Sequence, residues 1–171
     1  MKIKVTLSGK EFVRFSVFDA FHRKKIWLRP ALFAAILGAA AAVCFVMRQR
    51  QGAVLLGGVL LGVAVVLPAA YFLSFFLSLR GQVRKDGLDR PKYVYTLELH
   101  DSSGGIEVDN GREHAVYPWD QVFHAYRRPS AAYLYITPQR AFLIPYGCVE
   151  GGADGLWALI ERRIPEGRRT P

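Results

Sequence analysis

The sequence predicts an α+β membrane protein in which a two-helix transmembrane hairpin precedes a small antiparallel β-sheet domain closed by a C-terminal helix. Residues 30–47 and 52–79 contain no charged side chain, and the polar segment 48–51 separates these two apolar runs. Residues 93–144 contain a succession of short strand-like runs, and residues 156–164 repeat apolar side chains at helical spacing. We therefore divide the chain into an N-terminal segment (1–27), the hairpin (28–79), a connector (80–92) and the sheet domain (93–171).

The two predicted spans cover about residues 28–47 and 52–79. A helix rises ~1.5 Å per residue and the hydrocarbon core is ~30 Å thick, so about twenty apolar residues cross it. Helices in the core of a soluble protein would show a polar face somewhere along their length, and neither run has one. A secretory signal would begin within a few residues of the start, whereas 27 residues precede the first span. Both runs are therefore predicted to cross the bilayer.

The excess of positive charge lies in the membrane half of the chain. The formal net charge is +9; residues 1–80 carry eleven Lys and Arg against two acidic residues, whereas residues 81–171 carry twelve of each. Cations flanking transmembrane helices mark the cytoplasmic side. They flank the hairpin on both sides, and its turn has only Arg48 and Arg50, so both termini are expected in the cytoplasm. The neutral sheet domain argues against nucleic-acid binding.

The first residues are predicted to form a strand that joins the sheet domain. Residues 2–7 alternate apolar and polar side chains, which is the period of a half-buried strand. One short strand cannot stand alone, and a small open sheet has an edge that needs cover. We expect residues 2–7 to pair with the sheet built from residues 93–144, with Ile3 and Val5 buried.

An amphipathic helix is predicted next. Ser8 and Glu11 have the spacing of a capping box, which places the helix start near Gly9. One flank of the helix is aromatic and suits the interfacial plane of a membrane. Its aromatic members are Phe12, Phe15, Phe18 and Phe21.

Aromatic side chains are expected at one membrane boundary. Trp27 precedes the first span, and a cluster ends the second, namely Tyr71, Phe72, Phe75 and Phe76. Pro68 lacks the donor that would bond the Ala64 carbonyl, so a kink is expected in the second span.

Both spans carry small residues at four-residue spacing, which lets helix backbones approach closely. These are Ala34, Gly38 and Ala42 in the first span and Gly58 and Gly62 in the second. We expect this spacing to serve packing within the hairpin. A homodimer through Gly58 and Gly62 is the alternative.

The sheet domain is expected to be mostly strand. Strand-like runs cover about residues 93–100, 106–108, 113–117, 122–127, 132–136 and 141–144. Residues 101–105 form a predicted loop, and Asn110-Gly111 predicts a tight turn. A closing helix ends before Pro165, and the tail from residue 167 is expected to fray.

No pattern in the sequence indicates catalysis, a cofactor or a metal site. Cys44 lies within a span and Cys148 in a predicted loop, so the two are not expected to pair. The four histidines, His22, His100, His114 and His124, do not fall at ligand spacing with one another or with a cysteine pair. The glycines of residues 151–155 lack the Lys and Ser or Thr of a phosphate-binding loop.

Three groups of residues in the sheet domain are candidates for a binding or catalytic site. Trp119 serves as a recognition residue or, as we favour, as a core anchor. Arg127, Arg128 and Arg140 would bind a lipid phosphate if their strands brought them together. The rival hypothesis of a small enzyme acting on a lipid substrate needs Asp120, His124 and Arg140 to converge on one pocket.

The order of these parts resembles the YcxB-like family of bacterial membrane proteins. The most specific stretches are residues 117–122 (Tyr-Pro-Trp-Asp-Gln-Val), 132–136 and 140–145. The resemblance implies a C-terminal domain similar to part of a pleckstrin-homology (PH) fold, and it brings no catalytic residues to transfer. We expect a non-enzymatic protein of the bacterial cytoplasmic membrane that presents this domain to a protein partner or an anionic lipid headgroup.

Overall fold

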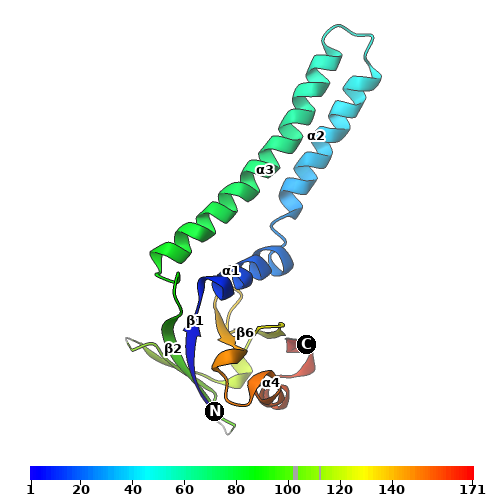
Figure 1. Ribbon diagram of the computed structural model, residues 1–171. Coiled ribbons are helices and arrows are strands. Elements are labelled where there is room, and N and C mark those ends of the chain that lie inside the picture. The colour runs from blue at the N-terminus through cyan, green and yellow to red at the C-terminus, as the bar shows by residue number, and fades with distance from the viewer. Residues whose placement is uncertain (102–103, 112) are drawn as a thin grey trace. The chain divides into compact units, whose positions relative to one another are not determined.

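The computed structural model describes residues 1–101, 104–111 and 113–171, which divide into two compact units (Figure 1). Residues 1–15 and 87–171 form the sheet unit, and residues 16–86 form the helical unit. The apolar helical hairpin, the antiparallel strands and the C-terminal helix confirm the predicted α+β fold.

The hairpin consists of α2 (Leu28–Val46) and α3 (Ala53–Lys85), which lie side by side (Figure 1). Each helix is long and apolar enough to cross a membrane. Helix α3 has 33 residues and continues through Gly81 into the predicted connector as far as Lys85. The helix ends there, where Gly87 adopts a positive φ of 68°.

The glycine of α3 that contacts α2 is Gly57, one position before the predicted Gly58. Ala41, Gly57 and Ala64 are buried, and a Cβ on Gly57 would lie 3.2 Å from the Cβ of Cys44. A Cβ on Gly58 would meet nothing within 4 Å, and the same holds at Gly38 and Gly62. Positions 57 and 64 are seven residues apart and therefore stay on one seam of the helix. The Gly58 and Gly62 face is exposed, so the homodimer contact through it stays a prediction.

A π-helical segment, η1 (Phe18–Arg23), lies near the start of the helical unit. Its Asp19 carboxylate forms ion pairs with Arg23 at 2.6 Å and Lys24 at 2.7 Å. The Phe21 ring stacks on Phe72 of α3, with ring centroids 5.7 Å apart. The aromatic cluster predicted from the sequence therefore includes Phe21 and packs within the protein.

The first sheet has the order β1-β2-β3-β4 and is antiparallel throughout. Its strands are β1 (Lys2–Leu7), β2 (Lys92–Leu99), β3 (Ile106–Asp109) and β4 (His114–Tyr117). The predicted pairing of the N-terminal strand is confirmed, because Ile3 lies opposite Leu97 and Val5 opposite Tyr95. Ile3 and Val5 are fully buried, as expected.

A second sheet has the order β7-β6-β5-β8. Its strands are β5 (His124–Arg127), β6 (Ala131–Tyr135), β7 (Ala141–Pro145) and β8 (Arg169–Thr170). The sequence predicts one sheet, but Pro118 and the 3-10 turn η2 (Trp119–Gln121) separate β4 from β5. Proline has no N–H to donate, and a 3-10 turn interrupts a strand ladder, which explains the division.

The expectation that the C-terminal tail frays is wrong. Strand β8 pairs in parallel with β5, after the short turn η4 (Glu166–Arg168). The Arg168 guanidinium donates to the carbonyls of Asp120 at 2.7 Å and Val122 at 3.0 Å. These charge-assisted bonds hold a segment whose composition alone gives no signal for order.

Helix α1 (Gly9–Val17) begins as its capping signal predicts, and α4 (Gly152–Arg163) closes the domain. The Glu11 carboxylate accepts from the Ser8 backbone N–H at 2.7 Å, and the Ser8 hydroxyl bonds the same carboxylate at 2.9 Å. Phe15 packs edge-on against Tyr133 of β6 at 5.1 Å between ring centroids. The apolar side chains of α4 are buried, namely Leu156, Trp157, Leu159 and Ile160.

Two predicted turns fall partly outside the described residues. Gly111 has a φ of 77°, as its predicted turn requires, and its N–H donates to the Asp109 carboxylate at 2.7 Å. Arg112 lies outside the description, as do Ser102 and Ser103 of the predicted loop 101–105.

Candidate functional site

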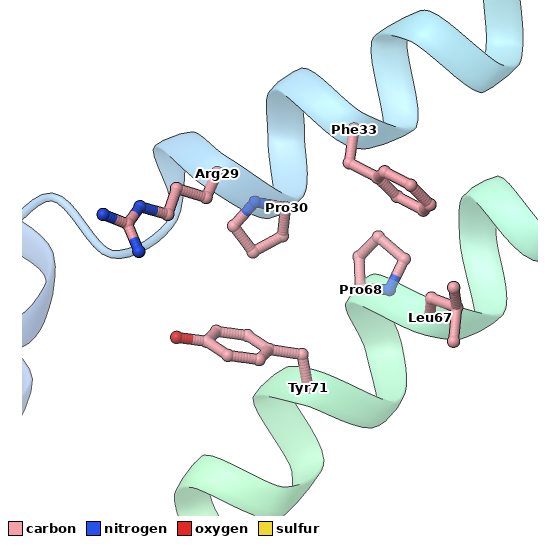
Figure 2. A pocket seen from close by; sticks show the side chains of 6 residues that line it. All are labelled: Arg29, Pro30, Phe33, Leu67, Pro68 and Tyr71. Atoms are coloured by element: carbon pink, nitrogen blue, oxygen red, sulfur yellow. The ribbon is translucent and has the colours of Figure 1, made fainter.

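A pocket of about 360 Å³ lies between the two helices of the hairpin (Figure 2). We call it the hairpin pocket, and it belongs wholly to the helical unit. Helix α2 contributes Arg29, Pro30 and Phe33, and α3 contributes Leu67, Pro68 and Tyr71. The sequence singled out Pro68 as a kink and Tyr71 as a boundary aromatic, but their convergence with Arg29 depends on how the helices pair.

Two prolines shape this part of the hairpin. Pro30 lies in the first turn of α2, where a missing N–H costs nothing. Pro68 lies inside α3 and cannot donate to the ladder of that helix. Beyond the close contact at Ala64, the helices leave a space that these two rings line (Figure 2).

The pocket has an apolar end and a polar end. Phe33 and Leu67 lie at one end, whereas the Arg29 guanidinium and the Tyr71 hydroxyl point toward the other (Figure 2). Arg29 has no acidic partner among the residues that the structure describes. The pocket thus combines a long apolar wall with one unpaired cation and one hydroxyl.

The polar end falls where a bilayer boundary is expected. Counting from Val46 to Arg29 at ~1.5 Å per residue gives about 26 Å along α2. Counting from Ala53 to Tyr71 gives about 27 Å along α3. Both values approach the ~30 Å hydrocarbon thickness, so Arg29 and Tyr71 reach the headgroup level together if the turn between the helices lies at the opposite boundary.

Trp119 takes the role of a core anchor rather than a surface hot spot. It is 9% exposed, and its indole N–H donates to the His100 carbonyl at 3.0 Å. This hydrogen bond connects η2 to the residue that follows β2. Trp119 thereby anchors the chain directly after the break between the two sheets.

The three arginines of the sheet domain do not form one cluster. Arg127 lies opposite Ala132 at the start of β6, whereas Arg140 directly precedes β7, next to the pair of Tyr135 with Ala141 at the far end of β6. Arg127 pairs with Asp154 at 2.5 Å, and the Arg140 guanidinium lies 6.0 Å from the centre of the Tyr117 ring. Arg128 follows Arg127 and so lies at the first of these two ends.

The rival enzyme hypothesis needs Asp120, His124 and Arg140 to meet in one pocket. Among the described residues, no contact joins these three side chains. His124 bonds the Thr170 hydroxyl at 2.9 Å, and partial burial lowers the pKa of its imidazole. The Asp120 carbonyl accepts from Arg168, and Arg140 lies over Tyr117. Neither described pocket is lined by Asp120, His124 or Arg140.

A second pocket, which is polar and has a volume of about 80 Å³, lies on the exposed face of the first sheet. Its lining includes Glu98 and Glu107, and Glu107 also contacts two imidazoles. His114 and His100 hold the pKa of the Glu107 carboxyl below its usual value, and Glu107 in turn raises the pKa of His114. Sequence spacing does not reveal this group, because its members come from neighbouring strands.

A family model matches part of the chain. The family model described as YcxB-like protein matches residues 102–156, which span β3 to the start of α4 and include the Tyr-Pro-Trp-Asp-Gln-Val stretch. No curated protein and no solved structure matches the chain. The resemblance drawn from the sequence is confirmed over this region, where the chain is similar to the YcxB-like family.

Proposed function

We propose that this YcxB-like protein is a non-enzymatic interaction protein, anchored in the bacterial cytoplasmic membrane, that binds an anionic phospholipid in the hairpin pocket. The observation that carries the proposal is the placement of Arg29 and Tyr71 together at the polar end of an otherwise apolar pocket. Its PH-like sheet domain is then presented at the cytoplasmic face to a protein partner.

The chemistry of the pocket suits a phospholipid. A guanidinium binds phosphate oxygens with two parallel N–H donors, and the Tyr71 hydroxyl adds a third donor. Pro30, Phe33 and Pro68 offer an apolar wall along which an acyl chain packs. A lipid lying there would keep its charge at the boundary and its hydrocarbon beside the helices.

A lipid-modifying enzyme is less well supported. Such an enzyme needs reactive groups that converge near the substrate. The hairpin pocket offers one cation and one phenol, and in the sheet domain His124 bonds Thr170 while Arg140 lies over Tyr117, so these two side chains have different partners.

The test is a lipid-binding titration of the purified full chain in nanodiscs of zwitterionic lipid, with fluorescent phosphatidylglycerol as the probe. A cation near the membrane surface contributes ~1 kcal/mol toward an anionic lipid, so Arg29→Gln should weaken binding about fivefold. Arg48→Gln, in the turn between the helices, is the matched control and should bind as the wild type does. Equal binding by the wild type and Arg29→Gln would contradict the proposal.

A further inference from the structure

Four side chains of the first sheet gather on its exposed face; we call them the Glu–His cluster. Glu98 of β2 lies directly opposite Glu107 of β3, so the two share one face of the sheet. His100 follows Glu98 by two positions, and His114 lies opposite Asp109, two positions after Glu107. Because side chains alternate along a strand, all four project to the same side.

The cluster converges on the Glu107 carboxylate. The His100 Nε2 lies 3.2 Å from one carboxylate oxygen, and the His114 Nε2 lies 2.6 Å from the other. Ligand atoms of Glu98, His100 and Glu107 all lie within 4.8 Å of one another. One imidazole and two carboxylates thus share one small volume, and His114 reaches it through its contact with Glu107.

The backbone beneath the cluster is held firmly. The His100 carbonyl accepts from the Trp119 indole, and the His100 N–H donates to the Gly105 carbonyl at 3.0 Å. A Cβ on Gly105 would lie 2.4 Å from the Tyr117 carbonyl oxygen, so only glycine allows this turn. The opposite face of the strands is fixed by burial of Leu97 and Leu99.

The donor set matches the preferences of one class of metal ion. Zn²⁺ takes imidazole nitrogen and carboxylate oxygen at ~2.0–2.2 Å in tetrahedral geometry, which separates neighbouring ligand atoms by about 3.3 Å. The His100 to Glu107 distance of 3.2 Å already fits this value. The His114 imidazole has to turn toward Glu98 and His100 to act as a fourth ligand, and its side chain is 56% exposed, so it has room to do so.

We propose that Glu98, His100 and Glu107 bind one divalent transition-metal ion of the zinc type, with His114 turning in as the fourth ligand. Lys2, which pairs with Glu98 at 2.5 Å, is 63% exposed and can turn toward solvent when the ion enters. The site is independent of the hairpin pocket, because it lies wholly in the sheet unit.

The test is a calorimetric titration of the purified full chain in detergent with Zn²⁺, after chelator treatment and without a polyhistidine tag. The wild type should bind one ion, and His100→Gln and His114→Gln should each weaken binding at least tenfold, since each removes a ligand. His124→Gln is the matched control and should bind as the wild type does, because His124 bonds Thr170 away from the cluster.

Two further readouts keep the test independent of variant folding. Histidine NMR signals of the wild type should shift on addition of Zn²⁺ at His100 and His114 but not at His124. Mg²⁺ at the same concentration should give no binding, because it prefers oxygen ligands. Unchanged binding in both histidine variants, unshifted signals at His100 and His114, or equal binding of Mg²⁺ would overturn the proposal.

Discussion

The hydroxyl of Tyr95 accepts a hydrogen bond from the Leu143 N–H at 2.9 Å and donates one to the Leu143 carbonyl at 2.8 Å. Tyr95 belongs to β2 of the first sheet and Leu143 to β7, an edge strand of the second. A single side chain therefore satisfies both outward backbone groups of an edge residue and ties the two sheets together. The contact also blocks pairing of that edge with another chain.

Tyr95→Phe is expected to destabilise the sheet domain by roughly 1–3 kcal/mol, because it leaves two buried backbone groups without a partner. Urea unfolding of the full chain in detergent, followed by tryptophan fluorescence, measures the change. Tyr93→Phe is the matched control, because the Tyr93 side chain is largely exposed and its hydroxyl bonds Thr96 at the surface. Equal losses in the two variants would show that the Leu143 contact contributes nothing.

The stability difference between the wild type and Tyr95→Phe should depend on pH. Burial raises the pKa of Tyr95 above its ordinary value of 10.0, so the folded protein keeps the proton while the unfolded chain loses it. The contribution of Tyr95 is then fully present below pH 10 and declines as the pH rises above it, by up to ~1.4 kcal/mol per pH unit. Unfolding of both proteins at pH 9 and pH 11 tests this sign, and a constant difference would refute it.

Gly57→Leu should destabilise the hairpin by roughly 1–3 kcal/mol, because the new side chain overpacks the contact with Ala41 and Cys44. Gly58→Leu, one position away, meets open space and should leave the hairpin intact. Thermal unfolding in detergent, followed by helical circular dichroism, separates the two variants. The packing assignment fails if Gly58→Leu is the more damaging change.

Ile3→Ala should cost roughly 2–5 kcal/mol of stability, because Ile3 is fully buried against the sheet. The neighbouring Lys4→Ala, on the exposed face of the same strand, should change stability by less than about 0.5 kcal/mol. Chemical unfolding of the two variants tests whether β1 is an integral strand. A small effect of Ile3→Ala would mean that β1 adds little to the core.

Local patterns in the sequence were sufficient to predict most of the elements. The uncharged runs give the two spans, the alternation of residues 2–7 gives β1, and the Ser8 and Glu11 pair marks the start of α1. Each of these patterns involves residues within a few positions of one another. Each arises because a single helix or strand has to satisfy its hydrogen bonds or bury its apolar face.

Relationships between elements were harder to predict. Gly58 has the expected small-residue spacing, yet Gly57 makes the contact, because the facing seam depends on how the two helices rotate against each other. Strand β8 forms through Arg168 and a distant carbonyl, which no local composition reveals. Arg29 and Tyr71, like His100 and His114, come together only through pairing of separate segments.

In the proposed topology, the hairpin crosses the membrane and both termini lie in the cytoplasm. The most direct measurement uses an impermeant maleimide on intact bacterial cells that express single-cysteine variants in a Cys44→Ser background. A cysteine placed at Gln49 should be labelled, whereas Cys148 and a cysteine placed at the exposed Gln139 should react only after permeabilisation. Labelling of residues 139 and 148 in intact cells, with residue 49 protected, would show that the topology is reversed.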